Sequence, residues 1–180
     1  MPDATELATL GGGCYWCLEA CFENLVGVSK CVSGFSGGAV ENPTYRAVCN
    51  GTTWHAEVVQ VTFDPTAITF SQLLETFFAI HDPTTLNRQG ADAGTQYRSA
   101  IFYHSPEQER AAGELIAKLN AEKAWPNPIV TQVAPFEKFY AADEYHQGYY
   151  RANPAQPYCV SVVSPKVAKM RQKFAKWLRA

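Results

Sequence analysis

The sequence predicts an α+β protein, a ferredoxin-like split βαβ sandwich of two layers with extra helices and a C-terminal helix. Apolar residues switch between strand-like and helix-like spacing in the order strand, helix, strand, strand, helix, strand. Glycine and proline turn signals separate these segments. The chain has 180 residues, 47% of them hydrophobic, which is enough to bury a core. We therefore expect one domain over residues 1–180.

The first half of the chain contains the segments that define this order. Leu18, Phe22 and Leu25 recur at helical spacing before Gly27, and the run EVVQVTF is rich in β-branched residues. Ser71 is expected to cap a helix rich in aromatic residues. The predicted elements are a strand at 6–10, a helix at 18–26, strands at 28–35 and 57–63, and a helix at 71–80.

The second half begins with a long loop at 81–96, and loops of that length are often functional. Pro106 is expected near the first position of the next helix. The predicted elements are a strand at 97–104, a helix from 105 to about 123, a strand at 129–134, a helical segment at 143–151, turns at 153–157 and a last helix at 165–178.

Charge and hydropathy exclude several classes of protein. The formal net charge is -2, so we expect no nucleic-acid partner. The opening residues lack the pattern of a signal peptide and no segment is long and apolar enough for a membrane span, so we expect a cytoplasmic protein with its six cysteines reduced.

The tail PKVAKMRQKFAKWLRA forms a basic amphipathic pattern. Contact with a membrane or a partner is conceivable, but we expect this helix to pack on the sheet.

The stretch GGGCYWC at 11–17 indicates a chemical site. Cys14 falls between a strand and a helix, where free N–H groups favour a thiolate, and glycines let a substrate approach the backbone. Cys14 and Cys17 could instead be buried helix residues or a redox Cys-x-x-Cys pair. The other cysteines and the histidines lack the spacing of metal ligands, so we expect no metal.

Several motifs in order along the chain resemble those of one family. They are GGGCYWCLEACFENLVGV, NPTY (42–45), HAEVVQVTFDP (55–65), HDPTTLNRQGADAGTQYRSAIFYH (81–104), YHQGYY (145–150) and QPYC (156–159). Together they are similar to peptide methionine sulfoxide reductase A and cover nearly the whole chain. The resemblance implies reduction of methionine (S)-S-oxide, free or in proteins, by a monomer without a cofactor.

The resemblance also implies the roles of five residues in the first step. Cys14 matches the nucleophile that attacks the sulfoxide sulfur. Glu57 matches the acid that protonates the oxygen, which requires burial to keep its proton. Tyr45 and Tyr97 match hydrogen-bond donors to that oxygen, and Asp92 matches the aspartate that organises the site and its water.

Further residues are implied in substrate binding and in recycling of the enzyme. Tyr15 and Trp16 match the aromatic wall of a pocket for the substrate methyl group. Cys159 matches the thiol that resolves the sulfenic acid as a disulfide, and thioredoxin then reduces the disulfide. Cys17 competes for the resolving role, but it would have to bridge within a packed helix.

Two departures from the family pattern and two alternative functions remain. Tyr15 replaces the usual phenylalanine and Trp54 replaces a glycine common before His-Ala-Glu, which could change substrate preference or the approach to Glu57. We expect His146 near the site without a chemical role. The alternatives are a general thiol–disulfide oxidoreductase using Cys14 and Cys17, and a non-catalytic module that binds methionine or is stabilised by zinc.

Overall fold

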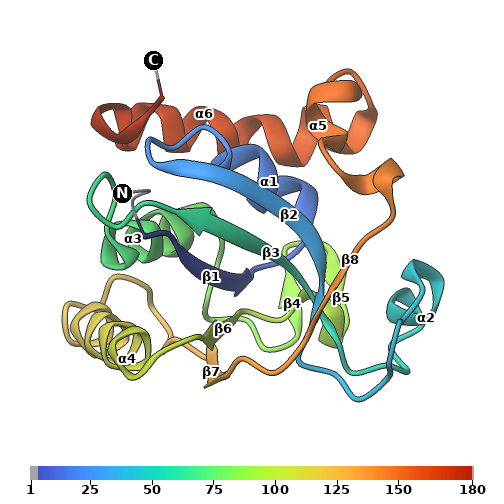
Figure 1. The fold of residues 1–180 in the computed structure, drawn as a ribbon, viewed down its shortest axis with the longest axis horizontal. Coiled ribbons are helices and arrows are strands. Elements are labelled where there is room, and N and C mark those ends of the chain that lie inside the picture. Colours follow the sequence, from blue (N-terminus) through green and yellow to red (C-terminus); the bar gives the residue numbers. More distant parts are fainter. Residues whose placement is uncertain (1–3, 180) are drawn as a thin grey trace.

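The computed structural model describes residues 4–179 as a mixed α+β fold. A six-stranded sheet runs in the order β7-β6-β1-β3-β2-β8, and a two-stranded hairpin, β4-β5, lies apart from it. In the sheet, β6 and β7 are parallel, and the other neighbouring strands are antiparallel. Figure 1 shows this twisted sheet with helices α1 and α6 above it.

The strands and helices alternate through most of the chain. The strands are β1 (Glu6–Gly11), β2 (Val28–Ser36), β3 (Ala56–Phe63), β4 (Arg88–Gln89), β5 (Asp92–Ala93), β6 (Ala100–Tyr103), β7 (Gln132–Pro135) and β8 (Phe139–Ala141). The helices are α1 (Tyr15–Phe22), α2 (Tyr45–Cys49), α3 (Phe70–Ile80), α4 (Pro106–Ala121), α5 (Tyr149–Ala152) and α6 (Ser164–Lys173). A π-helical turn over Cys159–Val163 leads into α6.

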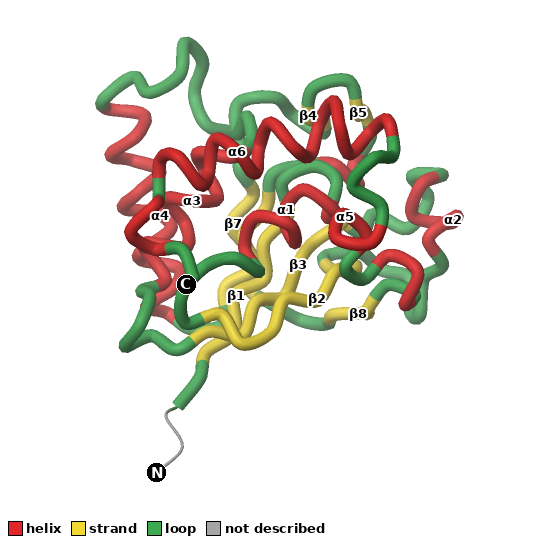
Figure 2. Tube along the Cα trace, turned by 90° about the horizontal axis from the view of Figure 1, so that it is seen from above, coloured by secondary structure: helices red, strands yellow, loops and turns green. Residues whose placement is uncertain are grey.

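Side chains alternate across the sheet, and this alternation decides which residues meet the helices. On β3, Val59, Val61 and Phe63 belong to the main core, together with buried residues of α1, α3 and α6. Ala56 and Val58 face the other way into a smaller apolar cluster. Figure 2 shows the helices lying over one face of the strands. Glu57 shares the helix-covered face with Val59, because the two are separated by two positions.

The structure shifts several predicted boundaries. Helix α1 ends at Phe22 rather than before Gly27, because the amides of Asn24 and Leu25 bond to carbonyls three residues back and form a turn. Helix α3 starts one residue earlier than predicted. The N-cap is Thr69, so the expectation of Ser71 is wrong, and Thr69 and Gln72 form a reciprocal capping box.

Other boundaries move because local turns interrupt the expected pattern. The strand predicted at 97–104 is β6 alone, since Tyr97 closes a 3₁₀ turn that begins at Thr95. The helix predicted at 143–151 splits at Gly148, which has a left-handed φ of 62°. The sequence analysis missed α2 and β8, which are short elements held by neighbouring segments rather than by an apolar pattern.

The basic C-terminal helix packs mainly against other helices, rather than on the sheet as expected. Val167 and Met170 of α6 are buried in the main core, and Phe174 is 8% exposed. Helix α6 contacts both α1 and α3. Among residues 4–179, no helix combines the length and the apolar character that crossing a membrane requires.

Candidate active site

Three glycines connect β1 to α1 and allow close packing around the junction. A Cβ at Gly12 would lie 3.1 Å from both His81 and Phe77. Gly13 has a φ of 95°, and a Cβ there would lie 2.7 Å from Gln89. The protein's own side chains fill the space that a Cβ would need at Gly12 and Gly13, so close packing requires glycine at both positions.

Cys14 occupies the N-cap position of α1 and is partly exposed. Enclosure by the surrounding site holds the pKa of its thiol well above the ordinary value, and the neighbouring Glu57 and Cys17 raise it further. The Trp16 amide and the Tyr158 hydroxyl act in the opposite direction. Desolvation therefore opposes the attraction of the short helix N-terminus for a thiolate in this state.

Glu57 is the buried carboxyl of the site, with 1% of its surface exposed. Its Oε1 accepts a hydrogen bond of 3.2 Å from the backbone N–H of Tyr15, the first residue of α1. Burial raises the pKa of Glu57 to about 8, and Asp92 adds to the shift, while the Tyr15 amide lowers it. At neutral pH the carboxyl therefore holds its proton, next to the residue that follows Cys14.

Trp16 forms an aromatic stack on the helix that bears Cys14. Its ring lies 3.7 Å from that of Tyr149 with an angle of 7° between the planes. Its Nε1–H donates to Nδ1 of His146 over 3.3 Å, and the Tyr158 ring meets it edge-on at 5.8 Å. These three contacts fix the orientation of Trp16, which remains partly exposed.

Tyr15 is fully buried beneath the site rather than displayed on a surface. Its ring centroid lies 5.7 Å from those of Phe35 and His146 and 6.5 Å from that of Tyr45. The Tyr15 hydroxyl is buried and has no hydrogen-bond partner among residues 4–179. Burial, followed by the Glu57 charge, raises the pKa of Tyr15, so the hydroxyl keeps its proton.

Tyr45 and Tyr97 come from separate segments, but Glu57 affects the pKa of both phenols. Tyr45 begins α2, and Tyr97 ends the 3₁₀ turn after β5. Burial is the main cause that raises the pKa of each phenol. The Glu57 charge adds to both shifts, and Asp92 also acts on Tyr97. Both hydroxyls are therefore neutral and able to donate at neutral pH.

Asp92 and Tyr158 connect the loop after α3 to the C-terminal region. The Tyr158 hydroxyl donates to Oδ2 of Asp92 over 2.6 Å. The same hydroxyl acts to lower the pKa values of Cys14 and Cys17, so it lies close to both thiols as well. The sequence analysis missed Tyr158, although its motif QPYC had been recognised for the cysteine that follows.

Cys159 is completely buried in the π-helical turn before α6. Its backbone N–H donates to the Gln156 side chain over 3.1 Å, and burial raises the pKa of its thiol. Cys17 is close enough to raise the pKa of Cys14, and Cys159 is close enough to raise that of Cys17. All six cysteines are free thiols in this structure.

The remaining candidates are the histidines and the exposed Trp54. His146 lies in the site as expected, with its ring centroid 4.3 Å from that of Tyr45 and tilted by 35° to it, and burial lowers the pKa of its ring. Within residues 4–179, no group of three or more His, Cys, Asp or Glu is placed to hold a metal ion. Trp54 is 64% exposed and has a φ of 62°, a conformation that glycine adopts without strain.

Comparisons with known proteins match the chain to one family. A profile of the family described as peptide methionine sulfoxide reductase matches residues 6–178. A relative from Deinococcus radiodurans, named peptide methionine sulfoxide reductase MsrA, is 56% identical over 176 residues. That match covers 98% of this chain and 85% of the relative.

Solved structures of similar proteins share the fold. The reduced form of Mxr1 from Saccharomyces cerevisiae has a TM-score of 0.79 and 37% identity, over 88% of this chain and 91% of that chain. Mxr1 in complex with Trx2 has a TM-score of 0.55 and 28% identity, over 83% and 87% of the two chains. The chain therefore belongs to the peptide methionine sulfoxide reductase A family.

Proposed function

We propose that this enzyme reduces methionine (S)-S-oxide, free or within proteins, to methionine. The observation that carries the proposal is the burial of the Glu57 carboxyl. This carboxyl is bound to the amide of Tyr15, one residue from the Cys14 thiol, and has a pKa of about 8. A sulfoxide oxygen leaves only after protonation, so a nucleophile beside a neutral acid suits this reaction. Family membership supports the same substrate.

The first step transfers oxygen from the substrate to Cys14. The Cys14 sulfur attacks the sulfoxide sulfur while Glu57 gives its proton to the oxygen, and the thiol proton of Cys14 restores the carboxyl. The sulfur–oxygen bond of the substrate breaks and a sulfur–oxygen bond forms on Cys14. Methionine leaves, reduced by two electrons, and Cys14 becomes a sulfenic acid, oxidised by two.

The surrounding residues stabilise the substrate during this step. Tyr45 and Tyr97 donate hydrogen bonds to the sulfoxide oxygen, and both phenols are neutral next to Glu57. Asp92 holds the Tyr158 hydroxyl toward Cys14. The partly exposed Trp16 ring forms the wall against the substrate methyl group, with Tyr15 packed beneath it as support.

The second step regenerates the enzyme through Cys159. Its thiol attacks the Cys14 sulfenic acid, a disulfide forms and water leaves. The dithiol of thioredoxin then reduces this disulfide and is itself oxidised. The existence of the Mxr1 complex with Trx2 supports thioredoxin as the reductant. Because Cys159 is fully buried, the turn at 159–163 has to open for this step.

We further propose a single ferredoxin-like domain that acts as a cytoplasmic monomer without nucleic-acid or membrane partners. The order β6-β1-β3-β2 in the sheet supports the split βαβ assignment. One main core links α1, α3 and α6, which supports one domain, although residues 1–3 and 180 of the predicted range lie outside the described residues. The six free thiols suit a reducing compartment.

The test of the reaction is an epimer-resolved assay of dabsylated methionine sulfoxide with dithiothreitol. We expect the wild type to consume only the S epimer, Cys14→Ser to be inactive, and the control Cys31→Ser to keep wild-type activity. No turnover by freshly reduced wild type, or turnover by Cys14→Ser, would contradict the proposal.

A second candidate is a thiol–disulfide oxidoreductase, which the proximity of Cys17 to Cys14 favours. Insulin reduction separates the two functions, because the sulfoxide reductase should not reduce insulin. Mass spectrometry after one equivalent of sulfoxide should find the Cys14–Cys159 bridge. If Cys14–Cys17 is the only bridge, the assignment of Cys159 is wrong.

A further inference from the structure

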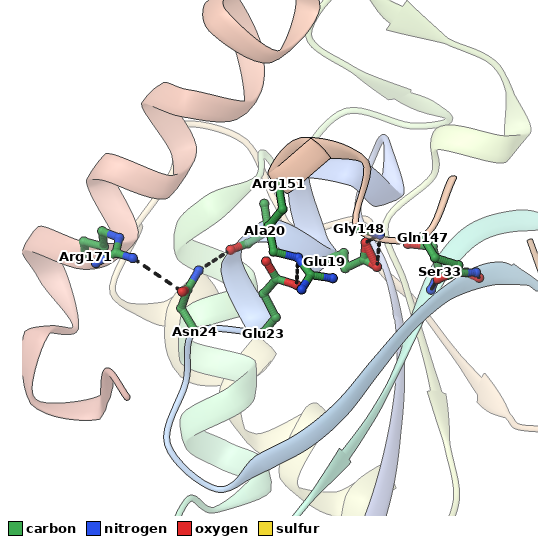
Figure 3. Close-up of polar contacts among 9 residues, drawn as sticks. All are labelled: Glu19, Ala20, Glu23, Asn24, Ser33, Gln147, Gly148, Arg151 and Arg171. Atoms are coloured by element: carbon green, nitrogen blue, oxygen red, sulfur yellow. Dashed lines mark hydrogen bonds and ion pairs between the residues drawn. The ribbon is translucent and has the colours of Figure 1, made fainter. Parts of the chain in front are cut away.

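Glu19 is a buried carboxyl that the proposed reaction does not use. It lies on α1 three residues after Trp16, so the two side chains emerge on the same side of the helix. Only 4% of Glu19 is exposed. Figure 3 shows its carboxylate directed toward the chain at Gly148.

The partner of Glu19 is a backbone amide at a conformationally special residue. The N–H of Gly148 donates to both carboxylate oxygens of Glu19, at 2.5 and 3.2 Å. Gly148 has a φ of 62° and begins α5. Gly148 has a left-handed backbone conformation and its amide is held by Glu19. Together these two features determine the direction in which the chain continues after Gly148.

Two residues close to Gly148 in the chain, His146 and Tyr149, hold Trp16. His146 accepts the hydrogen bond from Trp16 Nε1, and Tyr149 stacks on the Trp16 ring. Glu19 and Trp16 therefore contact the same segment of chain, over residues 146–149. The Gln147 side chain bonds to the backbone N–H and C=O of Ser33, which ties this segment to β2 as well.

The neighbouring acidic residue on α1 makes a different type of contact. Glu23 pairs with the Arg151 side chain over 3.2 Å, and Arg151 is largely exposed. Figure 3 shows both acidic residues reaching the same C-terminal segment. Among the described residues, Glu19 forms no such ion pair. A buried carboxyl held mainly by one amide is costly unless its position matters.

We propose that Glu19 is a positioning residue, which sets the place of His146 and Tyr149 against Trp16 by holding the Gly148 amide. This inference rests on the proposed function, in which Trp16 is the wall of the methyl pocket. Loosening the segment should weaken substrate binding more than the chemical step, because Cys14 and Glu57 are held by other contacts. Glu19 itself touches no substrate.

The experiment compares Glu19→Ala and Glu19→Gln with Glu23→Ala as the matched control. Glu23 has the same type of side chain one turn further along the chain, but it pairs with the exposed Arg151 side chain instead of the Gly148 amide. We expect Glu19→Ala to raise KM for methionine sulfoxide roughly tenfold, which corresponds to the loss of one charge-assisted hydrogen bond, with kcat changed less than threefold. Glu19→Gln, which keeps an acceptor oxygen, should restore most of the affinity, and Glu23→Ala should match the wild type.

A second readout distinguishes positioning from a general loss of stability. The Nε1–H resonance of Trp16, assigned with Trp16→Phe, should shift and exchange faster with water in folded Glu19→Ala but not in Glu23→Ala. Unchanged KM and an unchanged Trp16 resonance in folded Glu19→Ala would overturn the inference. If that variant does not fold, Glu19→Asp replaces it, and a wild-type KM for Glu19→Asp would overturn the inference equally. Absence of turnover in the wild type would instead count against the proposed function.

Discussion

The protonation of Glu57 follows from what the fold places around a single side chain. The carboxyl is buried on the helix-covered face of β3, accepts one 3.2 Å hydrogen bond from an amide, and has Asp92 nearby. One weak donor stabilises the charged form less than burial and a second carboxylate destabilise it. The result is an acid with a pKa of about 8 next to the Cys14 thiol.

The acid role of Glu57 predicts the pH dependence of the reaction. Because the protonated form is required, kcat/KM should fall as the pH rises through about 8. Glu57→Gln should lower kcat by roughly 10²- to 10⁴-fold, the usual contribution of a general acid. Steady-state assays from pH 6 to 10 with dithiothreitol check this, with Glu75→Gln on the exposed face of α3 as the control. An active Glu57→Gln enzyme would exclude the role.

Loss of the hydroxyl group should change the free energy of unfolding in opposite directions at two tyrosines of the site. The Tyr15 hydroxyl is buried without a partner in the described part of the chain, so Tyr15→Phe should raise the free energy of unfolding by about 1 kcal/mol. The Tyr158 hydroxyl donates to Asp92, so Tyr158→Phe should lower it by about 1.5–3 kcal/mol. Urea unfolding of both variants measures this. A destabilised Tyr15→Phe would mean that its hydroxyl has a partner, such as an internal water.

At the level of elements, short-range hydrogen bonds decided where helices begin and turns occur. Ser71 and Thr69 are both good capping residues, and only the path of the chain selects Thr69. The π-helical turn at Cys159–Val163 is a wider turn than an α-helix makes, and such turns are frequent at functional sites. No apolar periodicity marks either feature, so the sequence could not have identified them.

The corrected cap of α3 gives a direct test at this level. Thr69→Ala removes the acceptor for the Gln72 amide, and should lower the free energy of unfolding by about 1 kcal/mol. Ser71→Ala, at an exposed position inside the helix, should change it by less than 0.5 kcal/mol, as is usual for such surface sites. Chemical denaturation of the two variants side by side checks this. Equal losses, or a larger loss for Ser71→Ala, would restore Ser71 as the cap.

Across the whole molecule, two buried carboxyls make stability depend on pH. Burial raises the pKa of Glu57 to about 8 and that of Glu19 to about 7, from an ordinary value of 4.5. At pH values between the ordinary pKa and the raised pKa of each carboxyl, the folded protein keeps a proton that the unfolded chain releases. The free energy of unfolding therefore falls as the pH rises. The decrease begins near pH 4.5 and ends above pH 8.

Glu57 has the larger pKa shift of the two carboxyls, so replacing it should make the free energy of unfolding depend less on pH. Glu57→Gln should raise the free energy of unfolding at pH 9 by up to roughly 5 kcal/mol, since each pKa unit is worth about 1.4 kcal/mol. At pH 5 the effect should be small, because the carboxyl is largely protonated in both states. Urea titrations at pH 5, 7 and 9 measure the slope, with Glu75→Gln as the control. A wild-type slope in Glu57→Gln would show that other groups cause it.

The sequence by itself determined the family, the order of the main elements and the residues of the candidate site. Local periodicity and ordered motifs are properties of neighbouring residues, so Cys14, Glu57 and Cys159 could be named from them. Only the tertiary structure decided that burial keeps the Cys14 thiol and the Glu57 carboxyl protonated, and that Tyr15 lies beneath the site. Desolvation depends on atoms brought together from distant segments, and no local pattern records it.

The same reason explains the residues that sequence analysis missed. Tyr158 reaches Asp92 across 66 positions, and Glu19 reaches Gly148 across 129. Tyr149 stacks on Trp16 because α5 folds back over α1. The motifs placed these residues near functional neighbours in the chain, but which side chains meet is set by how the helices pack on the sheet.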